Sequence, residues 1–272
     1  MVTSVVLLLS VLVFGIAYSR VHAASAVCLP VPPPGDGKFG TLLLTAAVVV
    51  VTPSTTIIGP INAAGCDFGV YISASGTGTT VTATVTDANK VGVFNDGATG
   101  VTITRSTVSC TGNHMGTNTI PCSNFSPNGV QTGIDVYYSC TGTGTISSNT
   151  IDQYQKGGIT VRDLDGVTVT NNNVTGLGLV NFIAQNGIEF GFGSSCGPTV
   201  STTNVGQVTG NTVTDNQYNG NGGRAPPPYI SSGILAQAIG DPGPGQIQSA
   251  LVTTNRAFQN QGNVIVIAVV SP

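Results

Sequence analysis

Two short patterns alternate along most of this chain, and their alternation restricts the fold more than any other feature of the sequence. The first is a strand-like run of alternating apolar and small polar residues that ends in Asn, or once in Ser. It occurs at TITRSTV (102–108), TISSNTI (145–151), TVTNNNV (168–174), QVTGNTV (207–213) and LVTTNRA (251–257). The second is Gly or Asn followed by apolar–x–apolar, at GIDV (133–136), GITV (158–161), GIEF (187–190), GILA (233–236) and NVIV (263–266). Short strands that recur every 21–46 residues, roughly, predict a solenoid whose rungs contribute one strand to each face.

Stacked rungs place equivalent residues in columns about 4.8 Å apart. The column that ends the first pattern consists of Ser106, Asn149, Asn172, Asn211 and Asn255. An Asn side chain both donates and accepts hydrogen bonds, so a buried column of Asn can bond along the stack. We therefore expect a structural ladder at one corner, with Asn171 and Asn173 on either side of the bend at Asn172.

The repeats resemble those of a known family. The segments GTISSNTIDQYQKGGITV, VTVTNNNVTG, FIAQNGIEFGFG and GQVTGNTVTDNQY look like repeats of secreted right-handed parallel β-helix proteins of the pectate-lyase-like superfamily. The resemblance covers about residues 66–266. It implies an all-β fold, a right-handed parallel β-helix built as a single-stranded β-solenoid, and it leaves the function unassigned.

The N-terminal part of the chain has a different character. An apolar run at 5–18 followed by small residues predicts a secretory signal peptide over 1–23. A Pro- and Gly-rich segment at 24–40 predicts a linker, and 41–272 is expected to be the β-helix domain. The expected protein is secreted or located at the cell surface, and it is not an integral membrane protein once the signal is cleaved.

The cysteines of the mature chain suit an exported, disulfide-stapled protein, because their number is even. They are Cys28, Cys66, Cys110, Cys122, Cys140 and Cys196. Cys110 and Cys122 bracket a single loop, which makes them the best candidates for a local bridge. No C-x-x-C pair is present, so a zinc ribbon is not expected.

Charge excludes one class of partner. The net charge is −3 and only 7% of residues are charged, whereas a surface that binds nucleic acid needs clustered Lys and Arg. His114 is the sole histidine of the mature chain, so no metal site is expected. No cofactor is indicated either, since no motif supports the Ca²⁺ that related lyases use.

The second pattern supplies the candidate site. Aligned on their Gly residues, these strands direct Asp135 and Glu189 outward, two rungs or about 9–10 Å apart. Arg162 and Tyr137 follow in the next outward column. Two carboxylates at such a distance are what an inverting glycosidase needs, one as acid and one as base. A surface ion-pair cluster or a site in which Arg162 binds an acidic sugar are the alternatives.

The insertions lie beside the same strands. The longest gaps, 109–132, 175–186 and 214–232, all follow the first pattern and should leave from one corner. The last carries Tyr218, Arg224 and Tyr229, aromatic and polar groups of the kind that hold sugar rings. Variable loops on one face of a repeat protein are often its binding face.

Three functions remain open. The first is an extracellular protein that binds polysaccharide or another glycan along one solenoid face and its corner loops, without catalysis. The second is a polysaccharide lyase or glycoside hydrolase that uses Asp135 and Glu189. The third is a structural, adhesive or ice-binding solenoid, because outward Thr residues form columns, although Gln207 and Leu251 interrupt one of them. Uncapped helix ends would also allow self-association.

Overall fold

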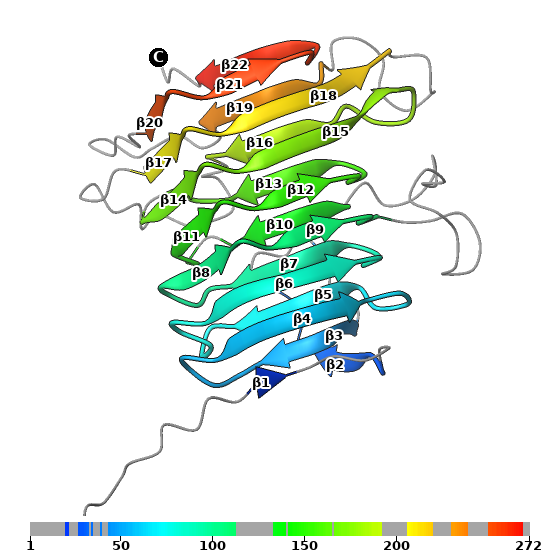
Figure 1. The fold of residues 1–272 in the computed structure, drawn as a ribbon, viewed down its shortest axis with the longest axis vertical. Coiled ribbons are helices and arrows are strands. Elements are labelled where there is room, and N and C mark those ends of the chain that lie inside the picture. The colour runs from blue at the N-terminus through cyan, green and yellow to red at the C-terminus, as the bar shows by residue number, and fades with distance from the viewer. Residues whose placement is uncertain are drawn as a thin grey trace, which may run out of the picture.

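The computed structural model describes residues 20–21, 27–32, 34, 39, 43–112, 133–139, 141–164, 166–191, 206–219, 230–238 and 250–268. These residues form a tall stack of short strands in two sheets (Figure 1). Apart from the pairing of β2 with β3, the described strands pair in parallel. The structure is thus the all-β, right-handed parallel β-helix that the sequence predicts.

The 9-stranded sheet takes one strand from each rung. In spatial order it contains β2 (Leu29–Val31), β3 (Leu44–Val50), β5 (Phe68–Ser73), β7 (Val91–Asp96), β10 (Ile134–Tyr138), β13 (Gly157–Val161), β16 (Asn186–Phe190), β19 (Ser232–Ala238) and β22 (Gly262–Ala268).

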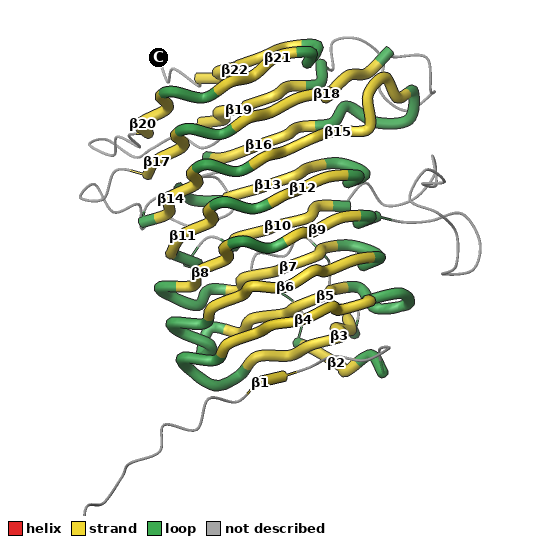
Figure 2. The backbone as a smooth tube through the Cα atoms, in the orientation of Figure 1, coloured by secondary structure: helices red, strands yellow, loops and turns green. Residues whose placement is uncertain are grey.

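The 13-stranded sheet bends along its middle, so most rungs contribute two strands to it (Figure 2). Before the bend lie β8 (Val101–Thr104), β11 (Gly144–Ser147), β14 (Val167–Thr170), β17 (Gly206–Thr209) and β20 (Ala250–Thr253). After it lie β9 (Thr107–Ser109), β12 (Thr150–Asp152), β15 (Asn173–Val180), β18 (Thr212–Tyr218) and β21 (Arg256–Phe258). The uninterrupted β6 (Thr80–Thr86) pairs with both β8 and β9, and with β4 (Thr56–Asn62), which also pairs with β1 (Arg20–Val21).

A ladder of Asn side chains runs up the bend. Asn149 Nδ2 donates to Asn172 Oδ1, Asn172 Nδ2 to Asn211 Oδ1, and Asn211 Nδ2 to Asn255 Oδ1, each at 2.9 Å. Each of these Oδ1 atoms also accepts the backbone N–H of the ladder residue one rung below it. At the foot of the column, Ser106 N donates to Asn149 Oδ1 at 2.9 Å.

The residue before each ladder position makes the turn. Arg105, Ser148, Asn171 and Thr254 have φ between 50° and 57°, and Gly210 has φ 68°. This left-handed conformation is unfavourable for most residues and is better tolerated by Asn and Gly. In the NNN triplet, therefore, Asn171 turns the chain, Asn172 bonds in the ladder and Asn173 begins the next strand.

Apolar side chains from both sheets fill the interior. Val81, Ile103, Ile146, Val169 and Val208 form one column of the fully buried core. The outward side of the 9-stranded sheet is also covered near the N-terminal end, where Phe39, Phe68, Tyr71, Phe94 and Tyr137 form a buried aromatic cluster.

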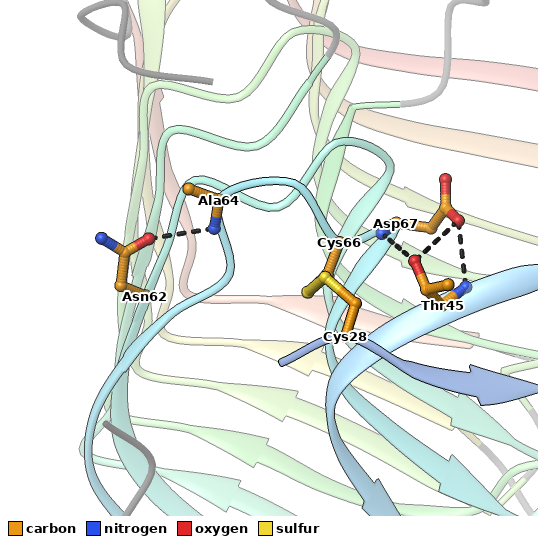
Figure 3. Close-up of a disulfide and its surroundings, with 6 residues drawn as sticks. All are labelled: Cys28, Thr45, Asn62, Ala64, Cys66 and Asp67. Atoms are coloured by element: carbon orange, nitrogen blue, oxygen red, sulfur yellow. Dashed lines mark hydrogen bonds between the residues drawn. A yellow bond between two sulfur atoms is a disulfide. The ribbon is translucent and has the colours of Figure 1, made fainter. Parts of the chain in front are cut away.

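Part of the expected linker belongs to the folded unit. Residues Leu29–Val31 form β2, which pairs antiparallel with β3 at the edge of the sheet. Pro30 is acceptable there because an edge strand has one side without ladder hydrogen bonds. A disulfide joins Cys28 to Cys66, and Asp67 beside it accepts hydrogen bonds from Thr45 N and Oγ1 (Figure 3). Leu29–Val31, within the segment predicted to be a linker, is therefore an edge strand of the 9-stranded sheet.

Replacing Asn172 by Ala should lower the free energy of unfolding by about 1–3 kcal/mol, because buried partners in two neighbouring rungs lose their hydrogen bonds. Urea denaturation measures the difference. Asn173→Ala is the matched control, since Asn173 is exposed and its loss should change stability by less than about 0.5 kcal/mol. Equal effects of the two substitutions would contradict the role of the ladder.

Removing the disulfide with Cys28→Ser and Cys66→Ser should lower the free energy of unfolding by about 2–4 kcal/mol, because the bridge closes a loop with a sequence separation of 38 residues. Thermal unfolding with and without reductant checks this. Wild type in reductant should match the double variant only if this bridge dominates the effect of reduction.

Candidate functional site

The register of the 9-stranded sheet differs from the alignment on Gly residues at β10, whereas β13, β16, β19 and β22 pair as aligned. Tyr137 pairs with Thr160, and Thr160 pairs with Glu189. Glu189 therefore shares its outward column with Tyr137, and Asp135 lies two positions away, level with Gly92 and Gly158. The prediction that Asp135 and Glu189 face the same way is wrong. The apolar pattern alone cannot detect a shift by two residues, because such a shift preserves the alternation of inward and outward side chains. In addition, the alternation breaks in these strands: the column of Asp135 and the next column, that of Val136, both face the interior.

Asp135 occupies a column that is Gly in neighbouring rungs. A Cβ built at Gly92 would contact Val108 Cγ1 and lie 3.2 Å from Thr111 Oγ1, and one at Gly158 would lie 2.9 Å from Tyr154 Cε1. This position therefore directs a side chain into the solenoid. Asp135 is 0% exposed, so its carboxyl group is enclosed and cannot contact a polysaccharide outside.

The Asp135 carboxyl group is poorly satisfied. In the described part of the chain neither of its oxygens has a hydrogen bond of good geometry, and neither does Thr111 Oγ1. Burial raises the pKa of Asp135 well above its ordinary value, and the charge of Asp152 raises it further, whereas the nearby Thr111 hydroxyl and Asp152 backbone lower it in part. The folded protein therefore favours the neutral acid.

Glu189 belongs to a group of buried polar side chains on the outward side of the 9-stranded sheet. Its Oε2 accepts a hydrogen bond from Asn186 Nδ2 at 2.9 Å, and Asn186 Oδ1 accepts one from Ser232 Oγ at 2.8 Å. Thr160 stands beside Glu189 on the next rung, and its buried Oγ1 has no hydrogen-bond partner in the described structure. We call Thr160, Asn186, Glu189 and Ser232 the polar island.

The polar island interrupts a buried apolar column. The column of Glu189 contains Tyr71, Phe94 and Tyr137 on one side and Leu235 on the other. Glu189 is 5% exposed, and Arg162, two residues beyond Thr160, is half-buried at the margin. Thr160, Asn186 and Ser232 were not anticipated from the sequence. Their only signal is that Asn186 and Ser232 both directly precede the Gly of a strand.

The other predicted site residues have different positions. Tyr137 is fully buried, with its ring centroid 5.2 Å from that of Phe94, so it cannot stack on a sugar from solution. Tyr218 is also buried, at the end of β18. Arg224, Tyr229 and Cys122 lie outside the described residues. Cys110 is disulfide-bonded, and its pairing with Cys122 stays a prediction.

Metal ligands and membrane spans can be assessed for the described ranges only. These ranges contain no group of three or more His, Cys, Asp or Glu side chains placed to hold a metal ion. Nor do they contain a helix with the length and hydropathy to span a membrane.

Comparisons with known proteins give a structural likeness. No protein-family model matches the sequence, and no curated protein matches it. The chain is similar to the crystal structure of Dettilon tailspike protein, with 14% identity and a TM-score of 0.44 over 81% of this chain. The match spans 55% of the tailspike chain, and the assignment to the right-handed parallel β-helices rests on the sheets described above.

The buried acid generates a prediction about pH. Because the folded-state pKa of Asp135 is raised, its contribution to stability is fully present below the unfolded pKa of about 3.9 and is lost as pH rises through the folded pKa. Asp152, whose pKa burial also raises, acts in the same direction. The free energy of unfolding of Asp135→Asn, measured in urea between acidic and mildly alkaline pH, should fall less steeply than that of wild type. Parallel curves would show that Asp135 titrates normally.

Proposed function

We propose that this protein binds glycan, without catalysis, at the polar island on the outward side of the 9-stranded sheet. The four island side chains are at most 5% exposed, so a sugar group would reach them from the half-buried Arg162 at their margin. The observation that carries the proposal is Thr160 Oγ1, a buried hydroxyl that has no hydrogen-bond partner in the described structure and lies beside Glu189 in an otherwise apolar column. Leaving a polar group buried and unbonded costs about 1–3 kcal/mol. A ligand that supplies the missing hydrogen bond offsets that penalty.

The chemistry of the island suits sugar hydroxyl groups. The Glu189 carboxylate accepts hydrogen bonds, whereas the Asn186 amide and the Thr160 hydroxyl can both donate and accept them. Groups on adjacent rungs lie about 4.8 Å apart, a spacing at which one sugar residue can reach both. The Arg162 side chain at the margin suits an acidic sugar, because guanidinium binds carboxylate in a two-pronged geometry.

Hydrolysis has less support than binding. An inverting hydrolase needs a second carboxylate about 6.5–9.5 Å from the first, with room for a water molecule between them. The sequence predicted Asp135 as this second carboxylate. Asp135 lies inside the solenoid, so it cannot serve in that role. Secretion remains part of the proposal and is supported by the apolar run at 5–18 and by the Cys28–Cys66 disulfide.

A glycan array followed by calorimetry on the hits tests the proposal. Thr160→Val removes the unpaired hydroxyl at nearly constant shape, so it should leave stability unchanged or higher while weakening glycan binding about tenfold, or 1.4 kcal/mol. Glu189→Gln should weaken it as well. Thr170→Val, the same substitution on the other sheet, is the matched control and should bind like wild type.

Two results would contradict the proposal. One is a wild-type protein that binds no glycan on the array, and the other is unchanged affinity in both Thr160→Val and Glu189→Gln. Release of reducing ends or unsaturated products from a bound polysaccharide, abolished by Glu189→Gln, would instead establish the enzymatic alternative.

A further inference from the structure

The opposite side of the molecule carries a regular array of hydroxyl groups. Before the bend, the outward residues of the 13-stranded sheet form two columns in register. The first contains Thr56, Thr80, Thr102, Thr145 and Thr168, and the second contains Thr104, Ser147, Thr170, Thr209 and Thr253. We call these two columns the hydroxyl face.

The spacing of the hydroxyl face is set by the backbone. Rungs lie about 4.8 Å apart, and outward residues of one strand lie about 6.6 Å apart, twice the rise per residue. The columns reach water, because Thr102, Thr145, Thr168, Ser147 and Thr170 are all partly exposed. Hydrogen bonds between rungs orient some hydroxyl groups, as from Ser147 Oγ to Thr104 Oγ1 at 3.2 Å and from Thr209 Oγ1 to Thr170 Oγ1 at 3.3 Å.

High β-propensity accounts for Thr on both sides of the bend, but it does not account for the absence of charge before the bend. The same rungs continue past the bend, and most outward positions there are also Thr or Ser, among them Thr107, Thr150 and Thr212. Those columns are interrupted by the charged Asp152 and Arg256 and by Asn173 and Phe258. Within the two columns of the hydroxyl face, by contrast, no residue is charged, and Gln207 and Leu251 are the departures among the later rungs.

We propose that the hydroxyl face binds ice. A surface that repeats one side chain in two dimensions fits a ligand that also repeats in two dimensions, whereas a protein partner presents an irregular surface. The face is uncharged, as is an ice surface, and each Thr offers a hydroxyl group that bonds to water and a methyl group that does not. A crystalline polysaccharide is also periodic, but sugar rings are held by aromatic side chains, and the two columns contain none.

This inference is independent of the glycan site, because the two surfaces lie on different sheets and share no residue. It predicts thermal hysteresis and incorporation of the folded protein into a slowly growing ice crystal.

Thr145→Lys tests the inference against a control on its own rung. The substitution would place a long charged side chain in the middle of the first column, and the thermal hysteresis should fall at least tenfold. Thr150→Lys makes the same change five residues later, on the other side of the Asn149 bend, and should keep wild-type hysteresis. Circular dichroism and melting temperature establish that both variants fold. Thr168→Val is a further variant with little risk to folding, because it keeps the side-chain shape and removes only a hydroxyl group.

The outcomes separate the occupants of this face. Wild-type protein without hysteresis that is excluded from growing ice overturns the inference, as does equal loss of activity in Thr145→Lys and Thr150→Lys. Adsorption to crystalline cellulose or chitin that only Thr145→Lys abolishes would assign the face to a polysaccharide instead. A dimer in sedimentation analysis that dissociates in Thr145→Lys would assign it to a second copy of the chain. Glu189→Gln should leave ice binding intact. A wild-type protein that does not bind ice would therefore not contradict the glycan proposal.

Discussion

The hydrogen bonds between successive rungs are the constraint on which the rest of this structure depends. Backbone pairing keeps each strand in register with the strand above, and the Asn ladder repeats that register in side chains at the bend. A buried amide that was not bonded in this way would destabilise the fold. Each ladder residue both donates and accepts. If one strand slid along its neighbour by a residue, several buried donors and acceptors would lose their partners. Columns of equivalent residues are the direct result.

The same ladder explains which parts of the structure could be predicted from the sequence. The alternation of strands identifies the fold, and Asn149, Asn172 and Asn211 align the 13-stranded sheet correctly, because they are conspicuous residues at one place in each rung. A second column, in which Asn216 donates to Asn260 at 2.9 Å and Tyr154 donates to Asn216 at 2.6 Å, was missed because its earlier members are not Asn.

The 9-stranded sheet lacks such a marker, and there the sequence alignment is wrong at β10, although β13, β16, β19 and β22 pair as predicted. In IDVYY, Ile134 and Val136 make an apolar pair as good as Val136 and Tyr138, so two registers differing by two residues satisfy the pattern equally. The structure selects the second, with Val136 and Tyr138 in the core. Asp135 thereby falls into a column of Gly, a substitution that no rule of alternation anticipates. Thr160, Asn186 and Ser232 are ordinary polar residues in sequence, and only their burial makes them notable.

The two surfaces therefore follow from one constraint in opposite ways. In a stack with fixed register, repeating a side chain on every rung creates a two-dimensional lattice without any special backbone feature, as the Thr columns show. A local site instead requires that one or two residues differ from the rest of their column. The fold must then tolerate the cost of burying their polar groups. Glu189 between Thr160 and Leu235 is such a departure on an aromatic and aliphatic column. Regularity on one sheet and its interruption on the other are thus separate observations, and the proposals of a periodic ligand and of a discrete ligand rest on them independently.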